Sequence, residues 1–167
     1  MDNLILTEQQ NNVLIITLNR IDKKNALNTS MYQQLSTLFL QANDDNTVHC
    51  VVIQGDNQCF CAGNDLQDFI ASSQSENLAA FDFIKILAEF QKPLIAAVAG
   101  PAVGIGTTLL LHCDMVFTTE TAKFKLPFTQ LGLCPEAASS LLLPLRLGHN
   151  KAFELLVLGN MFNGQQA

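Results

Sequence analysis

The chain has 167 residues and a formal net charge of −6, and 49% of its residues are hydrophobic. This length and composition fit one globular domain over residues 1–167 and exclude a largely disordered chain. Charged residues make up only 14%, against roughly 25% in typical soluble domains, so we expect partner subunits to cover part of the surface. The acidic balance argues against a nucleic-acid partner, because neutralising phosphates requires an excess of Lys and Arg.

Short apolar runs alternate with helical patterns along the chain. Four runs predict buried strands, at Val13–Leu18, Cys50–Ile53, Leu94–Ala99 and Asp114–Thr118. Helices are predicted from a cap at Thr29 or Ser30 to Asn43–Asn46, and over Ser75–Phe90, Val103–Leu111, Pro135–Leu147 and Asn150–Leu158. This alternation predicts an α/β fold with partly parallel strands, which we expect to be covered on both faces because they are nearly all apolar.

One stretch has the length of a membrane span. Between Lys92 and Asp114 lie 21 uncharged residues, but Gly100-Pro101 near the middle favours a strand, a turn and a helix instead. Met1–Gln10 has no basic region and no apolar run typical of a signal peptide. The five cysteines form no CxxC pair, so we expect small buried side chains in a reducing, cytoplasmic compartment, with no membrane span.

Two loops have the composition of ligand-binding loops. Phe60–Leu66 follows a strand and a turn, and Ala99–Gly106 connects a strand to a helix start, where backbone N–H groups are free. Facing each other, they could hold an oxyanion from two sides. Their glycines are equally explained by chain turns and close packing. Leu109 stands where a dinucleotide-binding fingerprint requires its third glycine, so nucleotide redox chemistry is not expected.

Glu136 is a carboxylate among apolar and small residues. Pro135 suits the first position of a helix, which would place Glu136 in the first turn, where the helix dipole favours a negative charge. Apolar surroundings also raise the pKa of a carboxyl group, as a general base near neutral pH requires. The sequence leaves both interpretations open.

Other catalytic arrangements are not evident. His49, His112 and His149 lie in unrelated contexts and do not form a Ser-His-Asp pattern. The chain has no pair of metal ligands at helical spacing, and we predict no metal site.

Four motifs in register resemble the crotonase (enoyl-CoA hydratase/isomerase) superfamily. They are Asn19–Asn28, the Phe60–Leu66 loop, Lys92–Gly104 and Cys113-Asp114. The resemblance implies a spiral core of ββα turns, followed by C-terminal helices that build homotrimers or hexamers. It also implies that this C-terminal helical part is absent here. A C-terminal peroxisomal address would be absent with it, so a peroxisomal location is the alternative to the cytoplasm.

The resemblance also implies an acyl-CoA substrate and no separate cofactor, since coenzyme A is part of that substrate. By position, the backbone N–H groups of Asn64 and Ile105 match the oxyanion hole that binds the thioester oxygen. Ile105 stands where a glycine is common, and its side chain narrows the pocket. The positions matched to the CoA and acyl site are Lys24, Ala62, Gly63, Asn64, Asp65, Leu66, Gly104 and Ile105.

Two departures from the family pattern bear on the reaction. The two glutamates that activate water in hydratases match Thr108 and Phe128, neither of which is a base. The segment 135–140, which carries Glu136, resembles the Pro-Glu-x-x-Ser-Ser segment of peroxisomal-type Δ3,Δ2-enoyl-CoA isomerases. The resemblance therefore implies an isomerase that shifts the double bond of a 3-enoyl-CoA to the 2-trans position, with Glu136 as the proton shuttle.

Two other functions remain open. One is a non-catalytic module that binds acyl-CoA. The other is a different crotonase reaction, such as hydration of 2-enoyl-CoA, thioester hydrolysis or dienoyl-CoA isomerisation, with Asp68 or Glu120 as the working acid in the last two.

Overall fold

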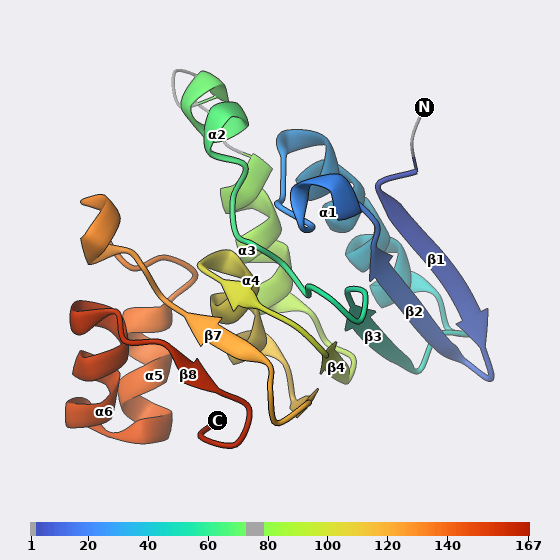
Figure 1. Ribbon diagram of the computed structural model, residues 1–167. Coiled ribbons are helices and arrows are strands. Elements are labelled where there is room, and N and C mark those ends of the chain that lie inside the picture. Colours follow the sequence, from blue (N-terminus) through green and yellow to red (C-terminus); the bar gives the residue numbers. More distant parts are fainter. Residues whose placement is uncertain (1–2, 73–78) are drawn as a thin grey trace.

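The computed structural model describes residues 3–72 and 79–167, which form two sheets with helices packed around them (Figure 1). The larger sheet has the strand order β1-β2-β3-β4-β6, with bounds Ile5–Gln10, Val13–Leu18, Cys50–Gln54, Leu94–Val98 and Met115–Thr118. The smaller sheet has the order β5-β7-β8, with bounds Ala102–Val103, Lys123–Lys125 and Phe162–Asn163.

Six α-helices lie within the described residues. They are α1 (Thr29–Asp44), α2 (Leu66–Ser72), α3 (Ala79–Glu89), α4 (Ile105–Thr108), α5 (Ser139–Leu147) and α6 (His149–Phe153). Short 3-10 turns are η1 (Ile21–Lys23), η2 (Leu109–His112) and η3 (Thr129–Leu131), and a π-helical turn, η4 (Glu154–Leu158), follows α6.

The larger sheet confirms the predicted α/β fold with partly parallel strands. Strands β2, β3, β4 and β6 pair in parallel, and β1 pairs antiparallel with β2 across a turn at Asn11 and Asn12, both with positive φ. Asparagine adopts this left-handed conformation at little cost. The sequence did not predict β1, because five of its six residues are exposed and three of these five are Glu or Gln.

The N-cap of the first long helix lies just before the two predicted cap residues. Asn28, rather than Thr29 or Ser30, is the N-cap of α1, and its side chain accepts a hydrogen bond from the Met31 N–H at 2.9 Å. The described part of α3 begins at Ala79. The predicted helix start at Ser75 lies outside the described residues.

The main hydrophobic core lies between the larger sheet and the helices α1 and α3. Phe39 and Phe83 are fully buried there, with ring centroids 5.7 Å apart. The prediction that both faces of every strand are covered is wrong for β6, since Met115, Val116 and Phe117 are all exposed.

The uncharged stretch after Lys92 folds as β4, β5, α4 and η2, which confirms the predicted strand and turn. The predicted helix Val103–Leu111 begins later than expected, because Val103 belongs to β5. Among the described residues, no helix combines the length and the apolar character needed to cross a membrane.

Candidate active site

The two glycine-containing loops lie against each other at the centre of the fold. The Cys61 N–H donates to Pro101 O at 3.1 Å, and the Val103 N–H donates to Cys61 O at 2.9 Å. On its other side, the Phe60–Leu66 loop pairs with Leu27, whose N–H donates to Gly63 O and whose carbonyl oxygen accepts from Asp65, both at 2.8 Å. The first loop is therefore fixed between the segment before α1 and the start of α4.

Glycines make this close approach possible. A Cβ atom at Gly106 would lie 2.5 Å from the carbonyl oxygen of Cys61, so any side chain there would push the loops apart. Gly104 has a φ of +55°, and a Cβ atom on it would lie 3.9 Å from the Cα of Gly63. Gly63 immediately precedes Asn64, and Gly104 immediately precedes Ile105. The two residues whose amides are predicted to form the oxyanion hole therefore follow glycines that lie next to each other.

The Asn64 and Ile105 amides have no hydrogen-bond acceptor among the loops, turns and caps that the structure describes. Ile105 is the first residue of α4, where N–H groups have no intrahelical acceptor. Ile105 itself is 1% exposed, so its side chain belongs to the core.

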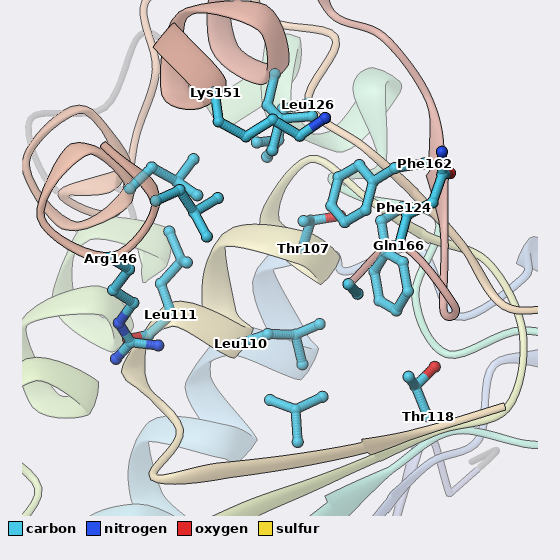
Figure 2. A pocket seen from close by; sticks show the side chains of 15 residues that line it. Thr107, Leu110, Leu111, Thr118, Phe124, Leu126, Arg146, Lys151, Phe162 and Gln166 are labelled. Carbon is cyan, nitrogen blue, oxygen red and sulfur yellow. The ribbon is translucent and has the colours of Figure 1, made fainter. Parts of the chain in front are cut away.

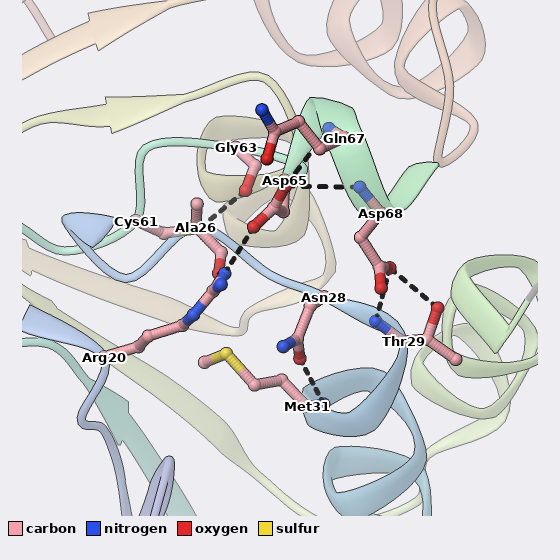
Figure 3. Close-up of polar contacts among 10 residues, drawn as sticks. All are labelled: Arg20, Ala26, Asn28, Thr29, Met31, Cys61, Gly63, Asp65, Gln67 and Asp68. Atoms are coloured by element: carbon pink, nitrogen blue, oxygen red, sulfur yellow. Dashed lines mark hydrogen bonds and ion pairs between the residues drawn. The ribbon is translucent and has the colours of Figure 1, made fainter. Parts of the chain in front are cut away.

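One salt bridge and several side-chain hydrogen bonds hold the loop that carries Asn64 (Figure 3). Arg20 Nη1 donates to Asp65 Oδ2 at 2.8 Å and to Ala26 O at 2.9 Å. This hydrogen bond from Arg20 lowers the pKa of Asp65. Asp68 Oδ2 accepts from both the N–H and the hydroxyl of Thr29, each at 2.7 Å. Both carboxylates thus anchor the loop to the segment that leads into α1.

Tyr32 lies beside the same loop. Its side chain is buried in α1, and its hydroxyl donates a hydrogen bond to Asn64 Oδ1. Burial raises the pKa of Tyr32 well above its usual value, and the nearby carboxylate of Glu136 raises it further. The phenol therefore stays protonated and remains a donor at physiological pH. Burial likewise raises the pKa of Cys61 to about 12, which makes this thiol a poor nucleophile.

Glu136 does not lie in the first turn of a helix, so that prediction is wrong. The helix α5 begins at Ser139, three residues later, and both Ala137 and Ala138 have left-handed backbone conformations with φ of 50° and 54°. Non-glycine residues adopt this region at an energetic cost, and such strain is frequent at functional sites. The strained pair bends the chain after Glu136, and the helix-dipole explanation for this carboxylate no longer applies.

The Glu136 side chain points to α4 instead. The hydroxyl of Thr108 donates to Glu136 Oε1 at 2.6 Å. Burial raises the pKa of Glu136, while this hydrogen bond lowers it to a smaller extent. Thr108 stands three residues after Ile105, and residues at this spacing share one face of a helix. The carboxylate therefore contacts the same short helix that begins with the Ile105 amide.

The other predicted site residues have less constrained surroundings. Lys24 and Leu66 are exposed, and Ala62 is half-buried, with its N–H donating to Lys24 O at 3.0 Å. Phe128 is buried in a second hydrophobic cluster, against residues of α5, α6 and η4. Glu120 is exposed. The sequence analysis did not identify Tyr32 as a site residue. Tyr32 is the only tyrosine of the chain and lies on a helix with an apolar stripe, and this unusual position could have indicated a role for its hydroxyl.

A separate apolar cavity of about 330 Å³ lies between α5, α6 and the smaller sheet (Figure 2). Leu110, Phe124 and Phe162 line it, together with the long side chains of Arg146 and Lys151. Thr107 also faces this cavity, whereas its neighbour Thr108 contacts Glu136. Asn64, Ile105 and Glu136 are not among its lining residues.

No group of three or more His, Cys, Asp or Glu side chains able to hold a metal ion occurs within the described residues.

The site thus contains two backbone N–H groups without an acceptor among the described residues and one partly buried carboxylate with a raised pKa. Paired N–H groups stabilise negative charge on a carbonyl oxygen, and a carboxylate with a raised pKa removes a proton from a neighbouring carbon. Such a pair suits reactions through an enolate.

Several known proteins are similar to this chain in sequence and in fold. Residues 8–167 match the enoyl-CoA hydratase/isomerase family. Enoyl-CoA delta isomerase 2 of Rattus norvegicus is 38% identical over 98% of this chain and 43% of its own length. A probable enoyl-CoA hydratase of Rhizobium meliloti is 34% identical over 98% of this chain and 64% of its length.

Among solved structures, Pseudomonas aeruginosa OdaA has a TM-score of 0.95 and 50% identity, covering 99% of this chain and 68% of that one. The chain thus spans between about two fifths and two thirds of the length of these proteins. The family match covers nearly the whole chain, and the parallel-stranded fold agrees with the matched structures. The chain therefore belongs to the enoyl-CoA hydratase/isomerase family and has the crotonase fold.

Proposed function

We propose that the protein is a Δ3,Δ2-enoyl-CoA isomerase, acting on 3-enoyl-CoA to give the 2-trans product. The observation that supports this proposal is the partly buried carboxylate of Glu136, whose pKa is raised by burial and which accepts a hydrogen bond from Thr108 on the helix that begins with Ile105. Isomerisation moves one proton between two carbons and adds no water, so one base is sufficient. Hydration by two glutamates has no support, because Thr108 and Phe128 stand at the matched positions.

In the proposed reaction, the thioester oxygen accepts hydrogen bonds from the N–H groups of Asn64 and Ile105. Glu136 removes a proton from C2, and the electron pair of that C–H bond delocalises into a dienolate with its charge on the oxygen. The same carboxyl group returns the proton to C4 as the double bond settles between C2 and C3. Each oxyanion donor contributes a rate factor of about 10²–10³ in enzymes of this kind.

The test is an isomerase assay with 3-enoyl-CoA on the longest gene product that contains these 167 residues, and on its Glu136→Gln variant. We expect turnover in the first and a loss of about 10²- to 10⁴-fold in the second, with acyl-CoA binding retained. A parallel assay follows hydration of 2-enoyl-CoA. Turnover that survives Glu136→Gln would reject this residue as the base. Binding without turnover of either substrate would instead support a non-catalytic acyl-CoA module.

A further inference from the structure

The strongest unassigned contact near the site joins Thr108 to one oxygen of Glu136. Thr108 is 0% exposed, and its hydroxyl donates to Oε1 at 2.6 Å. Oε2 accepts no hydrogen bond from the described residues, and it is not one of the buried polar atoms without a partner there. The two carboxylate oxygens are therefore in different situations: Oε1 is held, and Oε2 is open to a ligand.

The helix α4 connects this contact to the oxyanion hole. Its four residues, Ile105–Thr108, begin with the Ile105 amide and end with Thr108. Thr107, between them, donates instead to Ala102 O at 2.6 Å, which ties the helix to the smaller sheet. Because one short helix carries both groups, the position of the carboxylate is fixed relative to the point where the thioester oxygen would bind. Such fixed geometry matters, since misplacement by about 1 Å can cost 10²-fold in rate.

We propose that Thr108 is a positioning residue: by holding Oε1, it leaves Oε2 of Glu136 as the one atom that takes the proton from C2 and returns it to C4. This inference rests on the isomerase function proposed above. The C2–H bond breaks as the Oε2–H bond forms, and the reverse exchange at C4 completes the transfer. C2 and C4 are separated by one carbon, so Oε2 serves both positions without rotation of the carboxyl group.

The hydrogen bond between Thr108 and Glu136 also decides whether the proton taken from C2 is the one delivered to C4. A carboxyl group held at Oε1 keeps the transferred proton directed at the substrate. Without that donor, the group rotates, and its proton exchanges with water before it reaches C4. A 3-enoyl-CoA labelled with deuterium at C2 reports this directly, through the fraction of label recovered at C4 of the product.

The experiment compares Thr108→Val, which removes the donor at nearly constant volume, with Thr108→Ser, which keeps it. We expect Thr108→Val to lower kcat by about 10- to 100-fold, the range for a lost hydrogen bond to a charged group, with KM nearly unchanged. Label recovery at C4 should fall, and the acidic limb of kcat/KM should move to higher pH, because the ionised carboxylate has lost a donor. Thr108→Ser should restore all three properties.

Thr107→Val is the matched control, since it also removes one buried hydroxyl from α4. We expect it to lower thermal stability while leaving label recovery and the acidic limb as in the parent protein. If Thr108→Val does not fold, Thr108→Ala is measured in the same way. Parent-like label recovery and pH dependence in a folded variant without the Thr108 hydroxyl would overturn the inference, although the isomerase function would stand. An inactive parent protein would instead reject the proposed function itself.

Discussion

The Glu136 carboxyl group experiences two opposite effects, and burial is the larger one. Its pKa is therefore raised, so the proton leaves at a higher pH than from an exposed glutamate, which titrates near 4.3. A general base works only in its ionised form. Activity should thus be complete above this raised pKa and fall as the pH drops through it.

The corresponding prediction concerns the pH profile of kcat/KM for 3-enoyl-CoA. We expect an acidic limb that lies above the usual range of exposed carboxyl groups, measured in the free enzyme at substrate concentrations below KM. The residual activity of Glu136→Gln should lack this limb. A limb within the ordinary carboxyl range would assign the titration to another group.

Tyr32 provides a second prediction at the scale of single residues. Tyr32→Phe keeps the ring, which packs 5.7 Å from the ring of Phe83, and removes only the hydroxyl that donates to Asn64 Oδ1. We expect kcat to fall by about 10-fold, the effect of one lost hydrogen bond, with thermal stability nearly unchanged. The loss arises because the Asn64 backbone becomes less well fixed.

Asn64→Ala supplies the matching half of a double-mutant cycle, since it removes the acceptor but keeps the backbone N–H. If Tyr32 acts through the Asn64 side chain, the double variant is no slower than the slower single variant. Fully additive losses would show that the two side chains act independently.

At the scale of elements, the site depends on the contact between the Phe60–Leu66 loop and α4. Gly106→Ala would place a methyl group 2.5 Å from the Cys61 carbonyl oxygen, so the loops must separate. We expect a lower melting temperature and a lower kcat, measured by thermal unfolding and by the isomerase assay. Gly148→Ala is the control: its φ of +76° makes alanine unfavourable, but the new methyl group meets no atom within 4 Å. It should lower stability and leave kcat unchanged.

The sequence predicted those strands and helices in which nearly every residue favours the same secondary structure. The bounds of β2 match the apolar run Val13–Leu18, and β3 and β4 differ from their predictions by one residue each. In β1 and β7, exposed polar residues conceal the strand, and only pairing with a neighbour defines it. The prediction at Pro135 failed because Ala137 and Ala138 adopt a backbone conformation that alanine rarely takes, which tertiary contacts impose. One such contact is His112 Nε2, 2.9 Å from Ala137 O.

For the candidate site, the sequence indicated the two loops and the unusual carboxylate. It did not indicate the contacts between them. Thr108 and Glu136 are 28 residues apart, and Tyr32 and Asn64 are 32 apart, so only the fold brings each pair together. In the sequence, Thr108 stands where hydratases have a glutamate, whereas in the structure its hydroxyl donates a hydrogen bond to Glu136.

The accessible surface of the chain is larger than expected for a compact monomer, and many large apolar side chains are exposed on it. The accessible area is 9308 Å², against about 8,000 Å² expected for a folded monomer of this mass. Large apolar side chains are exposed on the segment from α5 to η4, at Leu141, Leu145, Leu147, Phe153, Val157 and Leu158. Large apolar side chains exposed in such number on one segment are typical of a surface that contacts a partner.

We therefore predict that the 167-residue chain associates with itself through this segment. Sedimentation velocity over a range of protein concentrations should show mass increasing with concentration, and added salt should not reverse it, because apolar contacts are little screened by ions. Leu141→Lys combined with Leu145→Lys should shift the distribution towards monomer, since desolvating two charges opposes burial of this face.

Ile21→Lys, at an exposed apolar position on η1, is the matched control and should associate like the parent chain. If both variants behave alike, the contact involves another surface, and the exposed edge strand β6 becomes the next segment to substitute.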